Sequence, residues 1–307
     1  MPRRTLAHIA LFLVNLIYGI NFVVAKGLMP VVIQPSAFIL MRVSGACILF
    51  WILRLFLPER VVPSDVKRLF LCALFGVVIN QLMFFEGLMR TSPINSSIIM
   101  VATPILVLVM SAMLIGERIT WLKIIGVLLG ASGAIALVFL KPEASGPDGS
   151  RLGDLFILIN AISYALFLVI VKPLMARYSA VTVMAWCFLF GLVMMIPIGI
   201  GDLLLVDWKG LTRPLIAAMA FVVIMVTFVA YLMNTWALRI VEPSLVGMYV
   251  YLQPLMAVLL TWLFMRIGAE RIGIPGNYDG ALGLPQIICA SLIFLGVHLV
   301  GRKPSTR

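Results

Sequence analysis

Three charged residues of this sequence lie within or at the edge of long apolar stretches, where an unpaired charge is costly. Lys26 ends the first stretch, Arg42 lies about seven residues (roughly 10 Å of helix) into the second, and Glu86 lies about four residues from the end of the third. Two cations and one anion at similar depth are expected to pair. They predict a charge cluster at the outer mouth of the apolar region, which holds a carboxylate or relays a proton through Glu86. A static salt bridge that only fixes helix packing is the alternative.

A second group of candidates consists of neutral polar and aromatic side chains embedded in the apolar stretches. Residues three and six to seven apart share a helix face, so Asn15, Tyr18 and Asn21 lie near one face. The complete set of substrate-cavity candidates is Asn15, Tyr18, Asn21, Asn95, Ser96, Thr103, Asn160, Tyr164, Tyr249, Tyr251 and Gln253. Such groups either line a cavity or hydrogen-bond between neighbouring helices, and the sequence leaves both open.

Composition identifies the environment of these side chains. Of the 307 residues, 63% are hydrophobic and 11% are charged, whereas soluble domains carry about 25% charged residues. The chain cannot cover a water-soluble surface, so its natural solvent is a lipid bilayer. A net charge of +11 raises nucleic acid as a partner, but the basic residues form short runs between apolar stretches and no basic face. The positive-inside rule explains them better.

Apolar stretches long enough to cross a bilayer as helices, about 20 residues each, recur along the chain. Ten are predicted, at 6–26, 35–57, 67–89, 94–115, 121–140, 153–173, 180–201, 213–238, 243–265 and 283–301. Their continuous apolar character favours helices over barrel strands. The predicted fold class is therefore an all-α integral membrane protein. Lys and Arg are more frequent in the inner segments when the N-terminus is placed inside, which predicts that both termini are cytoplasmic.

A polar segment at 141–152, KPEASGPDGSRL, divides the ten predicted helices into two sets of five. An odd number of spans in each half means that the second half crosses the membrane in the opposite sense. The sequence thus predicts two inverted five-helix repeats, 1–140 and 153–307, joined by this linker.

Repeated prolines support the duplication and predict where two helices are kinked. Pro93 and Pro104 recur 150 residues later as Pro243 and Pro254. The first of each pair lies near a predicted helix start, where proline is favoured. Pro104 and Pro254 lie inside helices, where each removes a backbone hydrogen bond and is expected to kink the helix. Such kinks turn polar backbone toward a cavity at mid-membrane.

Small residues inside the apolar stretches indicate close packing between helices. They do not indicate a metal site. The four cysteines Cys47, Cys72, Cys187 and Cys289 lack metal-ligand spacing. Gly126, Gly130 and Ala134 have the small-xxx-small spacing that permits two helices to approach closely, either within the molecule or in a dimer.

Three stretches of the sequence carry a family resemblance. They are IYGINFVVAKGL in the first predicted helix, AFILMRVSGACIL in the second, and EGLMRTSPINSSIIMVATPILVLVMSAMLIGERITWLKIIGVLLGASGAIAL in the third to fifth. The last is the most specific, because a proline is followed by Gly-Glu-Arg and a glycine-rich helix. Together they resemble the EamA-type family of the drug/metabolite transporter superfamily over nearly the whole chain. One departure is the longer external loop at 266–282.

The resemblance implies a ten-helix transporter of the bacterial inner membrane, with a central cavity that opens alternately to either side. It implies a small-metabolite substrate, often an amino acid, usually moved by export. No cofactor is expected. The implied partners are the substrate and the lipid bilayer, with protons as a candidate coupling ion and the oligomeric state open. The chain has no G-x-x-x-x-G-K-[ST] nucleotide-binding motif, so the energy must come from an ion gradient, the substrate gradient or a partner.

Two other classes of function compete with transport. A non-transporting receptor or scaffold would leave the inverted repeat without a role. A rhomboid-like intramembrane serine protease would use Ser132 as nucleophile and His298 as base. Ser132 is expected roughly 16 Å from the inner end of its helix and His298 about three residues from the inner end of the last helix. Proton transfer needs a separation of about 3 Å, so the sequence predicts that the protein is not an enzyme.

Overall fold

The computed structural model describes residues 3–29, 32–57, 59–90, 96, 99–139, 151–253, 255–256, 259, 263 and 284–301. These residues form helices joined by turns, with no strand among them. Six helical segments are long and apolar enough to cross a membrane. Shorter apolar helices lie at Ala102–Ile115, Trp121–Ala136 and Ile287–Gly301. The predicted all-α class is confirmed for this part of the chain.

The helices lie close to the predicted stretches. The first half contains α1 (Arg3–Leu28), α2 (Pro35–Arg54), α3 (Pro63–Ala73), the π-helical segment η1 (Leu74–Ile79), α4 (Asn80–Leu88), α6 (Ala102–Ile115) and α7 (Trp121–Phe139). The second half contains α8 (Arg151–Met175), α9 (Ala180–Leu204), α10 (Arg213–Phe221), the π-helical segment η2 (Val222–Val229), α11 (Ala230–Ala237), α12 (Pro243–Met248), the 3-10 turn η3 (Tyr249–Tyr251) and α14 (Leu284–Gly301). Helix α8 thus begins inside the C-terminal end of the predicted linker.

Local sequence explains several helix boundaries. Pro35, Pro63 and Pro243 each occupy the first turn of a helix, where the missing N–H has no intrahelical partner to lose. Helix α6 ends at Gly116, whose φ of 68° places it in the left-handed region that favours glycine.

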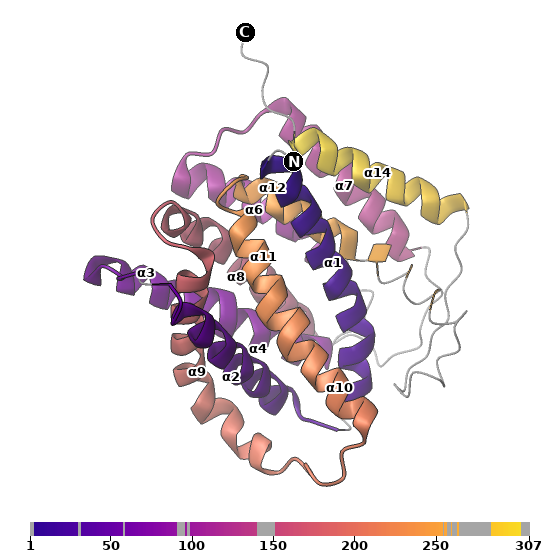
Figure 1. Ribbon diagram of the computed structural model, residues 1–307. Helices are drawn as coiled ribbons and strands as arrows, with labels where there is room; N and C mark the ends of the chain where they lie inside the picture. Colours follow the sequence, from indigo (N-terminus) through magenta and orange to yellow (C-terminus); the bar gives the residue numbers. More distant parts are fainter. Residues whose placement is uncertain are drawn as a thin grey trace.

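The two ends of the helix bundle are defined by the start of α1 and the end of α14, which lie close together in the upper part of Figure 1. An Arg4 guanidinium nitrogen donates to the Gly301 carbonyl, joining the start of α1 to the end of α14. Gly301 also approaches His8 and Leu245, so α12 starts at this end. We call it the terminal end and the opposite one the distal end.

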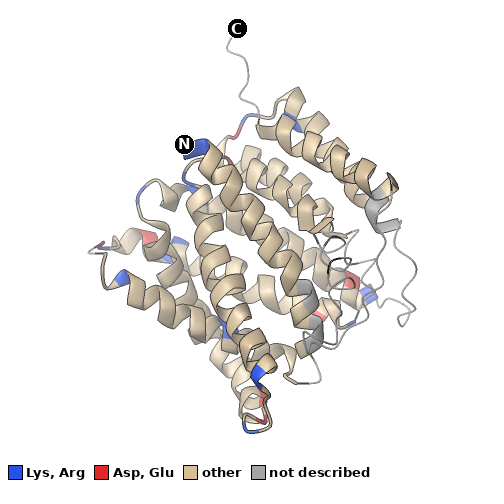
Figure 2. Ribbon diagram, turned by 45° about the vertical axis from the view of Figure 1, so that its right-hand side comes forward, with Lys and Arg blue, Asp and Glu red and all other residues tan. Residues whose placement is uncertain are grey.

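The long sides of the bundle are apolar. Ile48, Leu128 and Val193, in the middle of α2, α7 and α9, are each at least 60% exposed. Charged residues gather instead at the helix ends and in the connections (Figure 2). Large apolar side chains facing outward would be a liability in water. Lipid is therefore the solvent that fits this surface.

The helices of the two halves pack in exchanged pairs. A Cβ atom on Gly45 of α2 would lie 2.5 Å from Val223 of η2, and one on Gly191 of α9 would lie 2.8 Å from Val77 of η1. The two glycines are 146 residues apart, and so are the two valines. In the same way α4 and η1 pack against α8, whereas α11 and η2 pack against α1. Each contact thus has a counterpart in which the halves have changed places.

Helices α7 and α14 approach most closely through glycines (Figure 1). A Cβ atom on Gly126 would lie 2.7 Å from the Gly296 carbonyl oxygen, and one on Gly296 would lie 2.5 Å from the Gly126 carbonyl oxygen. The small-residue spacing therefore serves packing within the molecule.

The helical path breaks just before Pro104. Ile99 and Met100 are helical, Val101 is a turn, and α6 starts at Ala102. In the second half α12 gives way to the 3-10 turn Tyr249–Tyr251 at the matching place. Pro254 itself lies outside the described residues.

Candidate functional site

Two π-helical segments interrupt two of the helices that are long enough to span a membrane, one in each half of the chain. Segment η1 lies within Pro63–Leu88, and η2 lies within Arg213–Ala237. A π-helix shifts backbone carbonyls out of the regular ladder and is frequent at functional sites. Side chains of neighbouring helices donate to the carbonyls of η1: the Ser163 hydroxyl to Phe75 at 2.7 Å and the Tyr231 hydroxyl to Gly76 at 3.2 Å. Polar groups thus gather around the interrupted helices.

Arg42 lies buried between α2 and η2, with 4% of its surface exposed. Its Nε donates to the Thr227 hydroxyl at 2.9 Å, and this hydroxyl donates in turn to the Val222 carbonyl at 2.8 Å. The guanidinium carbon lies 5.4 Å and 5.3 Å from the ring centroids of Phe38 and Phe85. Cation–π attraction and one hydrogen bond therefore hold the charge in place.

Further polar side chains are linked to Arg42 directly or through tyrosines. The Asn234 amide donates to the Tyr164 hydroxyl at 3.0 Å, and half-buried Tyr18 lies close enough to Tyr164, Tyr231 and Arg42 to interact with them electrostatically. We call the following set the central polar cluster: Tyr18, Arg42, Gln81, Tyr164, Thr227, Tyr231 and Asn234.

The predicted pairing of Arg42 with Glu86 is wrong. Glu86 forms its ion pair with Arg90, four residues along the chain, and these two described side chains, Arg42 and Glu86, make no ion pair with each other. Residues at i and i+4 are neighbours on one helix surface, so Glu86 finds a cation without reaching into the interior. The Lys26 side chain lies outside the described residues.

Candidates on α1 and α8 divide between the cluster and local bonds. Tyr18 and Tyr164 belong to the central polar cluster. The Asn15 amide donates to the Leu11 carbonyl of its own helix at 2.7 Å, and the Asn160 amide donates to the Asn80 carbonyl at 2.7 Å. Half-buried Asn21 has an amide oxygen without a hydrogen bond among the described residues.

The aromatic candidates near η3 lie elsewhere. The Tyr249 hydroxyl hydrogen-bonds the His8 ring at 2.7 Å, toward the terminal end. The Tyr251 hydroxyl donates to the Val101 carbonyl at 3.1 Å, at the break before α6. These two tyrosines therefore hydrogen-bond groups on neighbouring helices and are not members of the cluster around Arg42.

The remaining candidates are the polar residues around α6 and after η3. Ser96 and Thr103 are buried, and their hydroxyls have no hydrogen-bond partner in the described part of the chain. Gln253 is half-buried. Asn95 lies outside the described residues.

Sequence reasoning missed four members of the central polar cluster: Gln81, Thr227, Tyr231 and Asn234. All four are polar residues inside predicted spans, 67–89 and 213–238, which was the available signal. Their convergence on Arg42 depends on packing between distant segments, which spacing along one helix cannot show.

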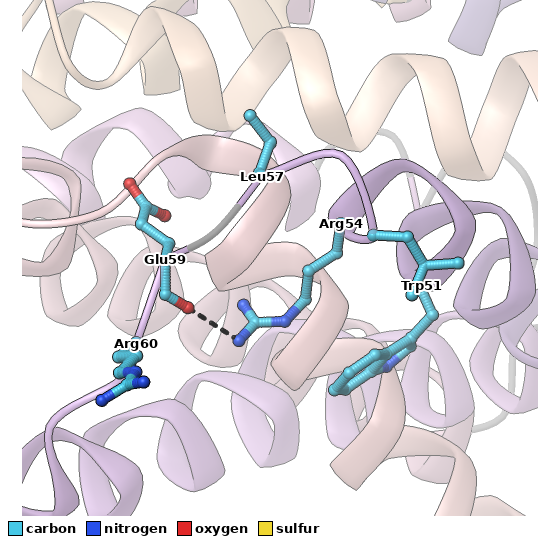
Figure 3. Close-up of a pocket in the computed structure, with 6 residues that line it drawn as sticks. Trp51, Arg54, Leu57, Glu59 and Arg60 are labelled. Carbon is cyan, nitrogen blue, oxygen red and sulfur yellow. Dashed lines mark hydrogen bonds between the residues drawn. The ribbon is translucent and has the colours of Figure 1, made fainter.

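Two hollows open at the terminal end, and neither contains the central polar cluster. One, of about 540 Å³, is lined by Thr5, His8, Tyr249, Phe294, Val297, His298 and Gly301. The other, of about 320 Å³, lies beside Trp51, Arg54 and Glu59 (Figure 3). There an Arg54 guanidinium nitrogen donates to the Glu59 carbonyl at 3.0 Å, and its carbon lies 5.2 Å from the Trp51 ring centroid. A basic and an aromatic side chain at a helix end are typical of membrane-interface anchors.

The Glu59 carboxylate in this second hollow caps a neighbouring helix. It accepts the Ser179 backbone N–H at 3.0 Å and the Ser179 hydroxyl at 2.9 Å. Burial raises the pKa of Glu59, but hydrogen bonds from Thr182 and Ser179 outweigh it, so the pKa is lowered from its usual value. The carboxylate is thus held ionised, and it fixes the connection between α2 and α3 to the start of α9.

The residues of the protease alternative do not meet. Ser132 is exposed on α7, and its hydroxyl donates to the Leu129 carbonyl at 2.9 Å. Its neighbour Gly133 faces Cys289 of α14, which is about nine residues, or roughly 13 Å, from His298. This separation excludes the direct proton transfer that a serine nucleophile requires.

An apolar exterior, long apolar helices and a buried polar cluster are the features of a multi-pass membrane protein. The model of the EamA-like transporter family matches residues 5–139 and 151–274. The chain belongs to this family, within the drug/metabolite transporter superfamily.

Relatives agree with this assignment. An uncharacterized transporter of Archaeoglobus fulgidus is 24% identical over 271 residues, covering 88% of this chain and 90% of the relative. A protein of Streptantibioticus cattleyicolor named as a probable terminal-alkyne amino-acid exporter is 23% identical over 246 residues, covering 79% of each. A solved crystal structure superimposes with a TM-score of 0.72 at 18% identity, covering 95% of both chains. This last likeness shows the fold.

Proposed function

We propose that the protein is a secondary transporter that exports an amino acid or a related small metabolite across the bacterial inner membrane by alternating access. In this proposal the chain crosses the membrane ten times as two inverted five-helix repeats, 1–140 and 153–307, with both termini in the cytoplasm. The central polar cluster is the substrate site. The outer mouth, where Lys26 and Glu86 are expected, is part of the pathway to it.

The observation that carries the proposal is the exchange of contacts between the halves. Gly45 packs on Val223 as Gly191 packs on Val77, and each half has a π-helical segment within its third predicted span. The family model also matches once in each half. A site built between two related halves of opposite orientation can open to either side by the same movement. A receptor or scaffold gives this symmetry no role.

Polar contacts at the terminal end supply one of the two gates. The Lys172 ammonium at the end of α8 donates to the carbonyls of Leu238 and Val241, at 2.6 Å and 2.7 Å. The Ser244 hydroxyl at the start of α12 donates to the Glu117 carboxylate after α6. These contacts join α6 and α8 to the connection between α11 and α12. We propose that they close the cytoplasmic side and separate when that side opens.

The substrate class rests on one named relative and on the site. The relative from S. cattleyicolor carries amino-acid export in its name, and the central polar cluster offers a cation, hydroxyls and amides. Export is favoured because both the resemblance and this relative indicate it.

Labelling of a cysteine placed at position 18 tests alternating access. The native cysteines are buried, so wild-type protein is expected to react little with a membrane-impermeant thiol reagent. Tyr18→Cys is expected to react from both sides of the membrane, because the site opens to each in turn. Phe12→Cys, on the outward face of the same helix, is the matched control and stays unlabelled. Reaction of Tyr18→Cys from one side only, under every substrate condition, contradicts the proposal.

A further inference from the structure

The Arg42 guanidinium is a buried cation whose charge the described residues do not neutralise. Ion pairs in this part of the chain include those of Glu86 with Arg90, Glu117 with Lys123, and Asp65 with Arg177. None includes Arg42, although it lies about a third of the way along a membrane-spanning helix. Buried cations in membranes usually pair, because the isolated ion is strongly disfavoured.

The donor capacity of Arg42 is largely unused. A guanidinium carries five N–H donors in a rigid planar fork. Only the Nε–H is committed, to Thr227, and the terminal nitrogens donate to no group among the residues the structure describes. The two terminal nitrogens form the free edge of the guanidinium. This edge can bind a carboxylate through two parallel hydrogen bonds.

The surroundings fix the guanidinium without occupying this edge. Rings of Phe38 and Phe85 lie within 5.4 Å of its carbon, and Thr227 is itself anchored to the Val222 carbonyl of η2. Aromatic faces attract the cation but leave its net charge in place. The guanidinium is therefore held in a fixed orientation that suits an anion, and the described residues contain no anion paired with it.

A second unsatisfied group lies beside the same tyrosine as Arg42. Gln81 is 3% exposed, and its amide oxygen has no hydrogen-bond partner in the described ranges. The Gln81 amide nitrogen lies within hydrogen-bond reach of the Tyr231 hydroxyl, and Arg42 interacts with the same tyrosine electrostatically. Buried polar atoms are rarely left unpaired, so an unpaired amide oxygen near an uncompensated cation indicates a polar ligand.

We propose that Arg42 binds the carboxylate of the transported substrate, and that Gln81 takes a second polar group of the same molecule, such as its ammonium. This inference rests on the proposed transport function and narrows it to substrates with a carboxylate. It moves the anion site from the predicted outer mouth into the central polar cluster. Because Glu86 is held by Arg90, it does not compete with the substrate for Arg42.

The first test uses wild-type protein and matched ligands. Purified full-length protein in proteoliposomes is offered apolar L-amino acids, their carboxamides and their N-acetyl derivatives, as competitors in exchange and as stabilisers against heat. Amino acids are expected to compete, and N-acetyl derivatives are expected to compete more weakly because they lack the ammonium. Carboxamides are expected to lose about 10–100-fold in apparent affinity, because a charge-assisted hydrogen-bonded pair is lost.

Two variants test whether Arg42 is the residue that distinguishes a carboxylate from a carboxamide. Arg42→Gln removes the charge and is expected to abolish discrimination between each amino acid and its carboxamide. Arg42→Lys keeps the charge without the fork, and is expected to retain discrimination at affinity reduced about tenfold. Arg213→Gln is the matched control, since Arg213 is an exposed arginine at the start of α10, and it is expected to behave as wild type.

The outcomes separate the two proposals. Equal competition by amino acids and carboxamides in wild-type protein overturns the role of Arg42 but leaves transport standing. So does full discrimination in folded Arg42→Gln. If no compound of any charge is exchanged, the transport function itself fails. The wild-type comparison decides the matter even when Arg42→Gln does not fold.

Discussion

A covalent link between positions 117 and 244 is expected to stop substrate exchange completely. The Ser244 hydroxyl donates to the buried Glu117 carboxylate, which also pairs with Lys123 at 2.5 Å. In the proposed mechanism this contact belongs to the gate at the terminal end, so it must break once in every cycle. Glu117→Cys with Ser244→Cys, joined by a short cleavable thiol cross-linker, would hold the gate shut. Exchange is measured in proteoliposomes before and after the linker is cleaved.

The controls separate gating from damage to the fold. Each single cysteine variant, treated with the same reagent, is expected to keep the exchange rate that it has without reagent. Cleavage of the linker is expected to restore exchange in the double variant. Undiminished exchange by protein that is demonstrably cross-linked would show that this end of the bundle does not open.

Gly296→Ala is expected to destabilise the protein by about 1–3 kcal/mol, the usual cost of overpacking a filled interior. An added Cβ would lie 2.5 Å from the Gly126 carbonyl oxygen and 2.8 Å from the Gly130 nitrogen. Both are backbone atoms, so no side chain can turn aside, and α7 and α14 must move apart. Thermal unfolding of the purified protein measures the effect.

Gly201→Ala is the matched control on α9. A Cβ atom there meets nothing within 4 Å, and alanine is a better helix former than glycine by up to about 1 kcal/mol. Its stability is expected to equal or exceed that of wild type. Equal stability of the two variants would mean that α7 and α14 do not pack through their glycines.

The helices could be predicted because their signal is local. A run of about 20 apolar residues is sufficient to mark a membrane helix, and proline marks the starts of α2, α3 and α12. The π-helical segments were not predicted. Leu74–Ile79 and Val222–Val229 are apolar sequences like their surroundings, and the shift in hydrogen bonding within them depends on contacts with neighbouring helices.

The site could be predicted only in part because its members come from distant segments. Tyr18, Arg42 and Tyr164 were identified as candidates from their polarity within apolar stretches. Arg42 was assigned the wrong partner, because similar depth in the membrane does not determine which helices are adjacent. Thr227, its actual partner, is 185 residues away, whereas Glu86 had a local arginine four residues away.

Counterflow in proteoliposomes that contain only the purified protein tests the central claim most directly. Vesicles loaded with one unlabelled amino acid or organic acid are given the same compound in labelled form, with and without a pH gradient. Transport predicts accelerated uptake of one class of carboxylate, absent from protein-free vesicles. A response to the pH gradient that disappears in Glu86→Gln would place proton coupling at Glu86. No accelerated uptake of any compound by folded protein would contradict the transporter assignment and favour a receptor or scaffold.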